Sequence, residues 1–343
     1  MRAQCFASDV TYNYDVLKNW DEDKVREFFE NGGGGEGAAP STKVLDIADA
    51  KDGVQTDPYA ASMPDECLWR INADKTVAVV TLNRPAAKNA MDDKLTQGMM
   101  LAVARAKCTP SLRVLFITGN GGMFCAGGDP KGFQAAKAAA DAAKASGETG
   151  DNANDASADA FANFLYDLNS LDCYVVALAN GSAMGGGVGL LCCCDCVLAR
   201  KTCYFALSEV KLGVIPATIS PYVVAKIGPP NARRLFMTGE TIPAEKALAM
   251  GLVQEVVTTP EELVKEAQKI CDTLLLAAPG AVAAAKKLVM NVQYQPITKE
   301  LQKYTANQLA LVRATEESAG GMVAVQAGKK PPWASSPLTF PPA

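Results

Sequence analysis

The sequence predicts an α/β fold that ends in a helical C-terminal region. Strand-like and helix-like segments alternate from about residue 67 to about residue 257. Two glycine-rich turns, at 124–129 and 181–187, each follow an apolar run typical of a buried strand. From residue 261 the hydrophobic pattern is helical almost to the end of the chain.

Local patterns predict the first elements in order. Segments 68–71 and 77–82 alternate like paired strands and are separated by a short polar turn. A helix is predicted over 92–107, with Asp92 or Asp93 at its N-cap.

The strands before the two glycine turns are predicted at 113–118 and 175–179. The second turn also opens a helix-like run, 188–194. Between the turns, segment 135–160 is rich in Ala, Asp, Lys and Gly, and we expect a loop at 146–152. That loop is either a lid over a site or a solvated excursion.

Three C-terminal helices are predicted, over 261–278, 281–290 and 298–318, with a break at Pro279 and Gly280. The last carries an apolar face too large for a free surface helix, which favours packing against another subunit.

Residues 1–65 have the composition of an extension. A short acidic helix is predicted at 20–30 and a flexible linker at 31–37. We expect a loosely ordered tail, with a partner-docking arm as the alternative.

Composition excludes several classes of function. The chain has 343 residues, 49% of them hydrophobic, and a net charge of −4, which gives no general attraction to nucleic acid or anionic membranes. The net charge therefore argues against nucleic-acid binding. No apolar run is long enough to span a bilayer, so membrane insertion is not expected either.

Cysteines and histidines narrow the chemistry further. Of 11 cysteines, Cys192, Cys193, Cys194 and Cys196 are too crowded to pair easily, which favours a reducing compartment, cytoplasm or organelle matrix. Neighbouring helix positions face different directions, so we expect these thiols to pack as small apolar groups and predict no metal site. With no histidine present, any acid or base must be Asp, Glu, Lys, Tyr or Cys.

The glycine turns indicate where a ligand approaches the backbone. Free N–H groups at such turns bind negative charge, and two that point at one atom form an oxyanion hole. Neither turn has the spacing of a dinucleotide or P-loop motif.

Taken together, these segments resemble the crotonase superfamily of enoyl-CoA hydratases and isomerases. The resemblance covers 66–333 and rests on motifs in a fixed order, at 82–85, 89–91, 124–129, 180–189, 206–209, 212–216, 238–240 and 328–333. It implies a spiral of ββα turns at 66–258 and a helical oligomerisation region at 259–343. Homotrimers or hexamers are implied, with coenzyme A as part of the substrate and no further cofactor.

The resemblance also implies roles for residues in the two turns. Gly128 and Gly186 match the two N–H donors of the oxyanion hole. Ala126 matches a carbonyl that accepts from the adenine amino group, and Gly127 shares its coenzyme A-binding turn. Lys88 lies in a loop that borders coenzyme A in relatives, where it is either a phosphate contact or a solvated surface residue.

Glu209 matches the second catalytic glutamate of the hydratases, and its apolar surroundings predict a partly desolvated carboxyl. The first glutamate is replaced by Gly189, a departure from the two-glutamate pattern. Segment 206–228 looks most like the methylglutaconyl-CoA hydratase-like branch. The expected reaction is enoyl-CoA hydration; the alternatives are Δ3,Δ2-isomerisation with one carboxylate, an acyl carrier protein substrate, or a non-catalytic scaffold.

Overall fold

The computed structural model describes residues 63–132, 138 and 152–334. The predictions for the helix at 20–30 and the linker at 31–37 lie outside these residues. So does most of the loop predicted at 146–152, of which only Asn152 is described.

The strands form two sheets, each mostly parallel. The first has six strands in the order β1 (Cys67–Ile71), β2 (Val77–Leu82), β3 (Val114–Gly119), β5 (Tyr174–Ala179), β7 (Cys196–Arg200) and β10 (Glu255–Val257). The second has four, in the order β4 (Met123–Cys125), β6 (Ser182–Met184), β8 (Tyr204–Ala206) and β9 (Thr241–Pro243). Among the strand pairs of the described residues, β1–β2 and β8–β9 are antiparallel and the others parallel.

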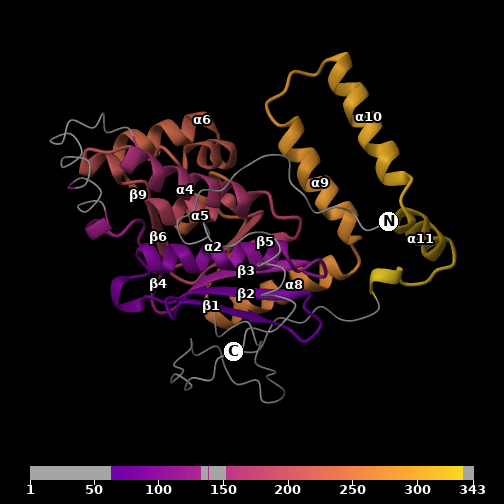
Figure 1. The fold of residues 1–343 in the computed structure, drawn as a ribbon, viewed down its shortest axis with the longest axis horizontal. Helices are drawn as coiled ribbons and strands as arrows, with labels where there is room; N and C mark the ends of the chain where they lie inside the picture. The colour runs from indigo at the N-terminus through magenta and orange to yellow at the C-terminus, as the bar shows by residue number, and fades with distance from the viewer. Residues whose placement is uncertain (1–62, 133–137, 139–151, 335–343) are drawn as a thin grey trace. The chain divides into compact units, whose positions relative to one another are not determined.

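Helices connect these strands and extend the chain beyond them (Figure 1). The α-helices are α2 (Asp93–Lys107), α4 (Asn152–Asn169), α5 (Gly186–Cys193), α6 (Ser220–Thr238), α7 (Ala244–Ala249), α8 (Pro260–Leu275), α9 (Pro279–Val292), α10 (Lys299–Arg313) and α11 (Glu316–Gln326). The described residues also form the 3-10 helices η2 (Pro85–Ala87), η3 (Glu209–Leu212) and η4 (Pro332–Ala334).

The chain order repeats one unit, a strand in each sheet followed by a helix. The units are β3–β4–α4, β5–β6–α5 and β7–β8–α6. Because each unit adds its strands beside those of the unit before, the chain winds as a spiral. The predicted α/β class and ββα spiral are confirmed.

Sequence signals set the ends of these elements. The Asp92 carboxylate caps α2 by accepting from the Leu95 N–H at 2.9 Å, which confirms the predicted helix start. Thr259 and Glu262 form a capping box that starts α8. In β1–β2, the Asn72 side chain accepts from the Thr76 and Val77 N–H groups and closes the predicted turn.

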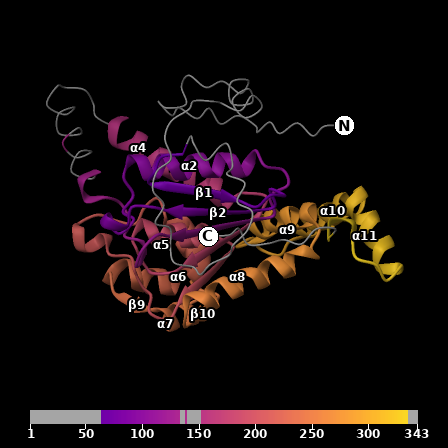
Figure 2. The same ribbon diagram turned by 90° about the horizontal axis from the view of Figure 1, so that it is seen from below.

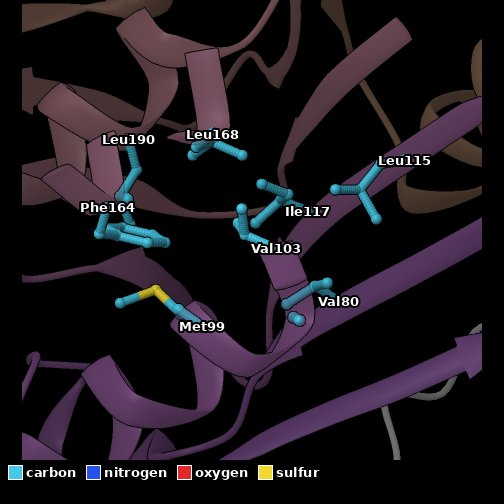
Figure 3. A pocket seen from close by; sticks show the side chains of 9 residues that line it. Val80, Met99, Val103, Leu115, Ile117, Phe164, Leu168 and Leu190 are labelled. Atoms are coloured by element: carbon cyan, nitrogen blue, oxygen red, sulfur yellow. The ribbon is translucent and has the colours of Figure 1, made fainter. Parts of the chain in front are cut away.

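The six-stranded sheet is buried on both faces (Figure 2). Because side chains alternate along a strand, Val80 and Leu115 face α2, α4 and α5, whereas Val79 and Phe116 face α8. Figure 3 shows the first face, where apolar side chains from two strands and three helices surround a small pocket. The lining is entirely apolar, as expected of a layer that fixes helices on a sheet.

The crowded cysteines are core residues. Cys192 and Cys193 end α5, Cys194 caps it, and Cys196 begins β7, each no more than 8% exposed. Burial raises the pKa of the Cys192 thiol to about 12, so it is neutral near pH 7. The prediction that these thiols pack as apolar groups is confirmed.

Helix α8, the first of the C-terminal region, covers one face of the six-stranded sheet. Polar contacts attach the next helix, α9, to the core. Lys286 of α9 pairs with Asp195 at 2.6 Å and donates to the Cys173 carbonyl at 2.6 Å. Asp195 also accepts from the Val175 N–H at 2.7 Å, so this carboxylate links α9 to β5.

Two boundary predictions are wrong. The single helix expected over 298–318 is two helices, since α10 ends at Arg313 and Thr315 caps α11 by accepting from the Ser318 N–H at 3.1 Å. Asn152, expected in a loop, begins α4. The start of α11 follows from local capping chemistry that a hydrophobic pattern overlooks.

Among the described helices, none is by itself long and apolar enough to cross a membrane. Helices α8 and α9 meet the length and composition test only as a pair, and they are bent by 105°.

Candidate active site

The two glycine turns lie against each other at the ends of β4 and β6. These strands pair in parallel, with Met123 opposite Ser182, so the turn after each strand leaves the sheet at the same edge. Gly127 has φ of +89°, and a Cβ there would lie 2.8 Å from the Met184 carbonyl oxygen and 3.3 Å from the Gly186 nitrogen. Only glycine fits this contact.

The Gly128 N–H is left available by the strand geometry around it. Met91 donates to the Gly127 carbonyl at 2.8 Å, and the Asp129 N–H donates to the Met91 carbonyl at 3.0 Å. Because groups alternate along an extended chain, the Gly128 N–H points away from Met91. In the part of the chain that the structure describes, it donates no hydrogen bond.

The Gly186 N–H is available for a different reason. Gly186 is the first residue of α5, where an N–H has no partner within the helix. It also finds no acceptor among residues 63–132, 138 and 152–334. Each turn therefore offers an unpartnered N–H donor, and the one at Gly186 lies at the positive end of a helix, where negative charge is favoured.

Glu209 stands beside this helix end. It begins η3 after β8, and its Oε1 would lie 3.1 Å from a Cβ placed on Gly185. Its Oε2 is buried and has no hydrogen-bond partner among the described residues. Burial raises the pKa of Glu209, and a backbone hydrogen bond only partly opposes that shift. The predicted desolvation is confirmed, and the carboxyl can exchange a proton at a higher pH than an ordinary glutamate.

The structure also brings Lys88 and Ala126 together. The Ala126 N–H donates to the Lys88 carbonyl at 3.0 Å, while the Ala126 carbonyl accepts nothing from the described residues. Lys88 and Asn89 both have left-handed backbones, with φ of 55° and 53°. The fully buried Asn89 amide stabilises that turn through the Arg84 N–H and two backbone carbonyls. The Lys88 side chain is exposed and forms no ion pair with any residue that the structure describes.

Arg84 is a positioning residue that the sequence analysis did not single out. Its guanidinium pairs with Asp92 at 3.0 Å and with Asp129 at 3.3 Å. The Lys131 N–H and Arg84 hold the pKa of Asp129 below its usual range. Asp129 directly follows Gly128 in the chain, but its carboxylate is ionised and is already paired with Arg84 and the Lys131 N–H.

Apolar side chains border the donors. A Cβ on Gly186 would lie 2.5 Å from Met91 Cε and 3.7 Å from Phe161 Cζ. Gly189 meets a tighter neighbour, because a Cβ there would lie 2.2 Å from Ile219 Cγ2. The packing therefore accounts for glycine at position 189.

Comparison with known proteins confirms the resemblance to the crotonase superfamily. A sequence profile described as Enoyl-CoA hydratase/isomerase matches residues 72–336. A carnitinyl-CoA dehydratase of Salmonella arizonae is 32% identical over 271 residues, which cover 77% of this chain and 97% of the relative. A carnitinyl-CoA dehydratase of Salmonella typhi is 36% identical over 220 residues, covering 64% and 78%.

Solved structures show the same fold. An enoyl-CoA hydratase from Shewanella pealeana aligns with a TM-score of 0.74 and 29% identity, covering 82% of this chain and all (100%) of that one. An enoyl-CoA hydratase/isomerase from Marinobacter aquaeolei aligns with a TM-score of 0.71 and 31% identity, covering 79% and 100%.

The ββα spiral, with two glycine turns meeting beside a half-buried carboxylate, defines a crotonase-type enzyme. The chain belongs to the enoyl-CoA hydratase/isomerase family. The similarity to its methylglutaconyl-CoA branch stays a prediction.

We expect Glu209→Gln to stabilise the protein at neutral and alkaline pH. A carboxyl whose pKa is raised on folding weakens the folded state as pH rises through that pKa, and glutamine does not ionise. The difference in stability between the variant and the native protein should vanish below the ordinary glutamate pKa of 4.5, where Glu209 is protonated in both the folded and the unfolded state. Urea midpoints at about pH 4 and about pH 8 measure it. Glu255→Gln, at an exposed position, is the control; an equal gain in both variants contradicts the expectation.

Proposed function

We propose that this enzyme adds water reversibly to α,β-enoyl-CoA thioesters. The observation that carries the proposal is the Oε2 of Glu209 beside the first turn of α5. Within the described part of the chain, neither this oxygen nor the Gly186 N–H has a hydrogen-bond partner. The Salmonella relatives, named as dehydratases of a CoA thioester, support the same chemistry in the reverse direction.

In this proposal the thioester oxygen accepts hydrogen bonds from the Gly128 and Gly186 N–H groups. Attack of water at C3 moves negative charge onto that oxygen, and fixed donors stabilise the resulting enolate more than the neutral thioester. The helix dipole of α5 adds to the effect at Gly186.

Glu209 supplies the proton transfers. As a carboxylate it accepts a proton from the attacking water, and as a carboxylic acid it returns that proton to C2. Both transfers use one carboxyl group on one face of the substrate, so the addition is syn and the protons balance. A raised pKa suits a group that must both gain and lose a proton.

The loop at Lys88 and the turn at Ala126 and Gly127 bind the coenzyme A portion in this proposal. The Ala126 carbonyl, which is free of partners among the described residues, accepts from the adenine amino group. The exposed Lys88 ammonium contacts a phosphate.

Δ3,Δ2-Isomerisation is the second candidate. Gly189 cannot carry a proton, and Glu209 alone can move one between C4 and C2 of a 3-enoyl-CoA. The same two N–H donors would stabilise the dienolate.

Product analysis in heavy-oxygen water tests the function. The protein is incubated with crotonyl-CoA, 3-methylglutaconyl-CoA, carnitinyl-CoA and 3-hexenoyl-CoA, and products are identified by mass spectrometry. We expect oxygen incorporation at C3 and a loss of roughly a hundredfold or more with Glu209→Gln. A shifted double bond without oxygen would establish the isomerase. No turnover of any substrate would favour the non-catalytic alternative.

Replacing Gly186 tests the donor. Proline is well tolerated at the first position of a helix, so Gly186→Pro removes the N–H and leaves α5 intact. We expect kcat to fall by about 10²–10³ with little change in stability. Gly186→Ala is the control, because it keeps the N–H and the flexible end of Met91 can move aside. Similar kcat values for the two variants would exclude a role for this N–H.

We also propose that the C-terminal helices join copies of the chain as a homotrimer or hexamer. None of the residues of α9 and α10 is fully buried in the single chain, and Leu311 of α10 is 64% exposed. Apolar side chains this exposed are typical of subunit contacts.

Leu311→Lys should lower the molecular mass in solution, because a charge in that contact would lose its hydration. Mass photometry measures the assembly, and Gln302→Lys, an exposed polar position on the same helix, is the control. A monomeric native protein would contradict the proposal.

A further inference from the structure

The orientation of the Gly128 N–H depends on a very short strand contact. Met91 and Gly128 form an isolated parallel bridge, in which the Gly127 carbonyl and the Asp129 N–H make the two hydrogen bonds to Met91. A bridge of one residue pair has no neighbouring pairs to keep it in register. A shift by one residue would turn the Gly128 N–H toward Met91 and away from a ligand.

The guanidinium of Arg84 contacts both segments of this bridge. On one segment, its Nη1 donates to the Ala90 carbonyl and its Nη2 pairs with Asp92 at 3.0 Å. On the other segment, both Nη atoms lie 3.3 Å from Asp129 Oδ2. Because Ala90 and Asp92 flank the bridged methionine and Asp129 follows the donor glycine, one guanidinium holds both segments in register.

Arg84 and Asp129 are themselves held in place and partly shielded from water. Their side chains are 19% and 15% exposed. The Arg84 N–H donates to the Asn89 side chain at 2.8 Å, and the Asn89 N–H donates to the Arg84 carbonyl at 2.9 Å. Asp129 Oδ1 accepts from the Lys131 N–H at 3.1 Å. A partly shielded ion pair between fixed groups is screened less than one in open water, so it can resist a change of register.

We propose that the Arg84–Asp129 ion pair aims the Gly128 N–H at the thioester oxygen. By keeping Met91 opposite Gly128, the pair leaves this N–H outside the bridge and directed at the substrate. Arg84 and Asp129 are positioning residues, because they touch no reacting atom and act only through the donor. The inference rests on the proposed function of Gly128 and adds to it the side chains that hold the donor in place.

The test compares two substitutions of the same kind. Asp129→Asn keeps an oxygen for the Lys131 N–H, which places the amide NH2 group against the guanidinium and breaks the pair. Asp92→Asn is the matched control, because it removes the same charge beside the same guanidinium and asparagine caps a helix as well as aspartate does.

Arg84→Lys is a second variant, and it decides the test if Asp129→Asn does not fold. One ammonium group lacks the planar fork with which the guanidinium reaches three partners.

The readout is the ionisation of bound acetoacetyl-CoA. Loss of a C2 proton to solvent converts this thioester into an enolate, which carries its negative charge on oxygen and has a distinct ultraviolet absorbance. Donors that stabilise the enolate lower the apparent pKa of the bound ligand. Butyryl-CoA, which forms no enolate near neutral pH, measures the binding of a neutral thioester by calorimetry.

We expect Asp129→Asn and Arg84→Lys to raise the apparent pKa of bound acetoacetyl-CoA by about one unit or more, a tenfold weaker preference for the enolate. For hydration of crotonyl-CoA, kcat should fall at least about tenfold, since outright loss of one such donor costs about 10²–10³. The Kd of butyryl-CoA should stay nearly unchanged, and Asp92→Asn should resemble the native enzyme.

Three results would overturn the inference. The first is a folded Asp129→Asn variant with the native kcat and the native pKa of the bound ligand. The second is an Asp92→Asn variant that loses as much as Asp129→Asn, because the effect would then follow the charge near Arg84 and not the contact beside Gly128. The third is an equal loss of affinity for the enolate and for butyryl-CoA, which would indicate a general loosening of the site.

The enolate measurement needs no turnover, which separates this inference from the proposed reaction. A native enzyme that only isomerises would overturn the hydratase proposal, while the effect of Asp129→Asn on the bound enolate would still support the inference. A native enzyme that does not lower the apparent pKa of acetoacetyl-CoA would exclude the donor role of Gly128, and the inference would fail with it.

Discussion

The contact between the two glycine turns is the constraint on which the rest of the site depends. A Cβ on Gly187 would lie 2.5 Å from the Cys125 carbonyl oxygen, and one on Gly181 would lie 2.4 Å from the Gly122 carbonyl oxygen. Backbone therefore meets backbone where β4 and β6 end. A methyl group at either position would separate the turns, and the N–H of Gly186 would move with α5.

Three polar groups meet near that contact, of which Glu209 Oε2 is buried and the two glycines are half-buried. The Gly128 and Gly186 N–H groups have no acceptor, and Glu209 Oε2 has no donor, within the described residues. An unpaired buried polar group typically costs about 1–3 kcal/mol. A fold retains such groups where a ligand can form hydrogen bonds with them. The nearby side chains of Arg84 and Asn89 are paired, and they stabilise the loops beside the first glycine turn.

Local chemistry could be predicted from the sequence, and contacts between distant segments could not. The strands, the glycine turns and the desolvation of Glu209 follow from short apolar runs and their neighbours. The role of Arg84 depends on Asp129, and the need for glycine at 189 depends on Ile219; each pair is brought close only by the spiral. The start of α11 at Thr315 was different: Thr followed by two glutamates is a local cap signal, hidden by the apolar pattern around it.

The pairing of β4 with β6 joins Met123 to Ser182, so the whole of α4 lies within the loop that this contact closes. The entropy of closing that loop must be overcome before the contact returns any energy. Helices can form within microseconds, whereas the two turns meet only after the spiral has wound. During refolding we therefore expect the donors at Gly128 and Gly186 to be assembled late, and the helical circular dichroism signal to return before a competent active site.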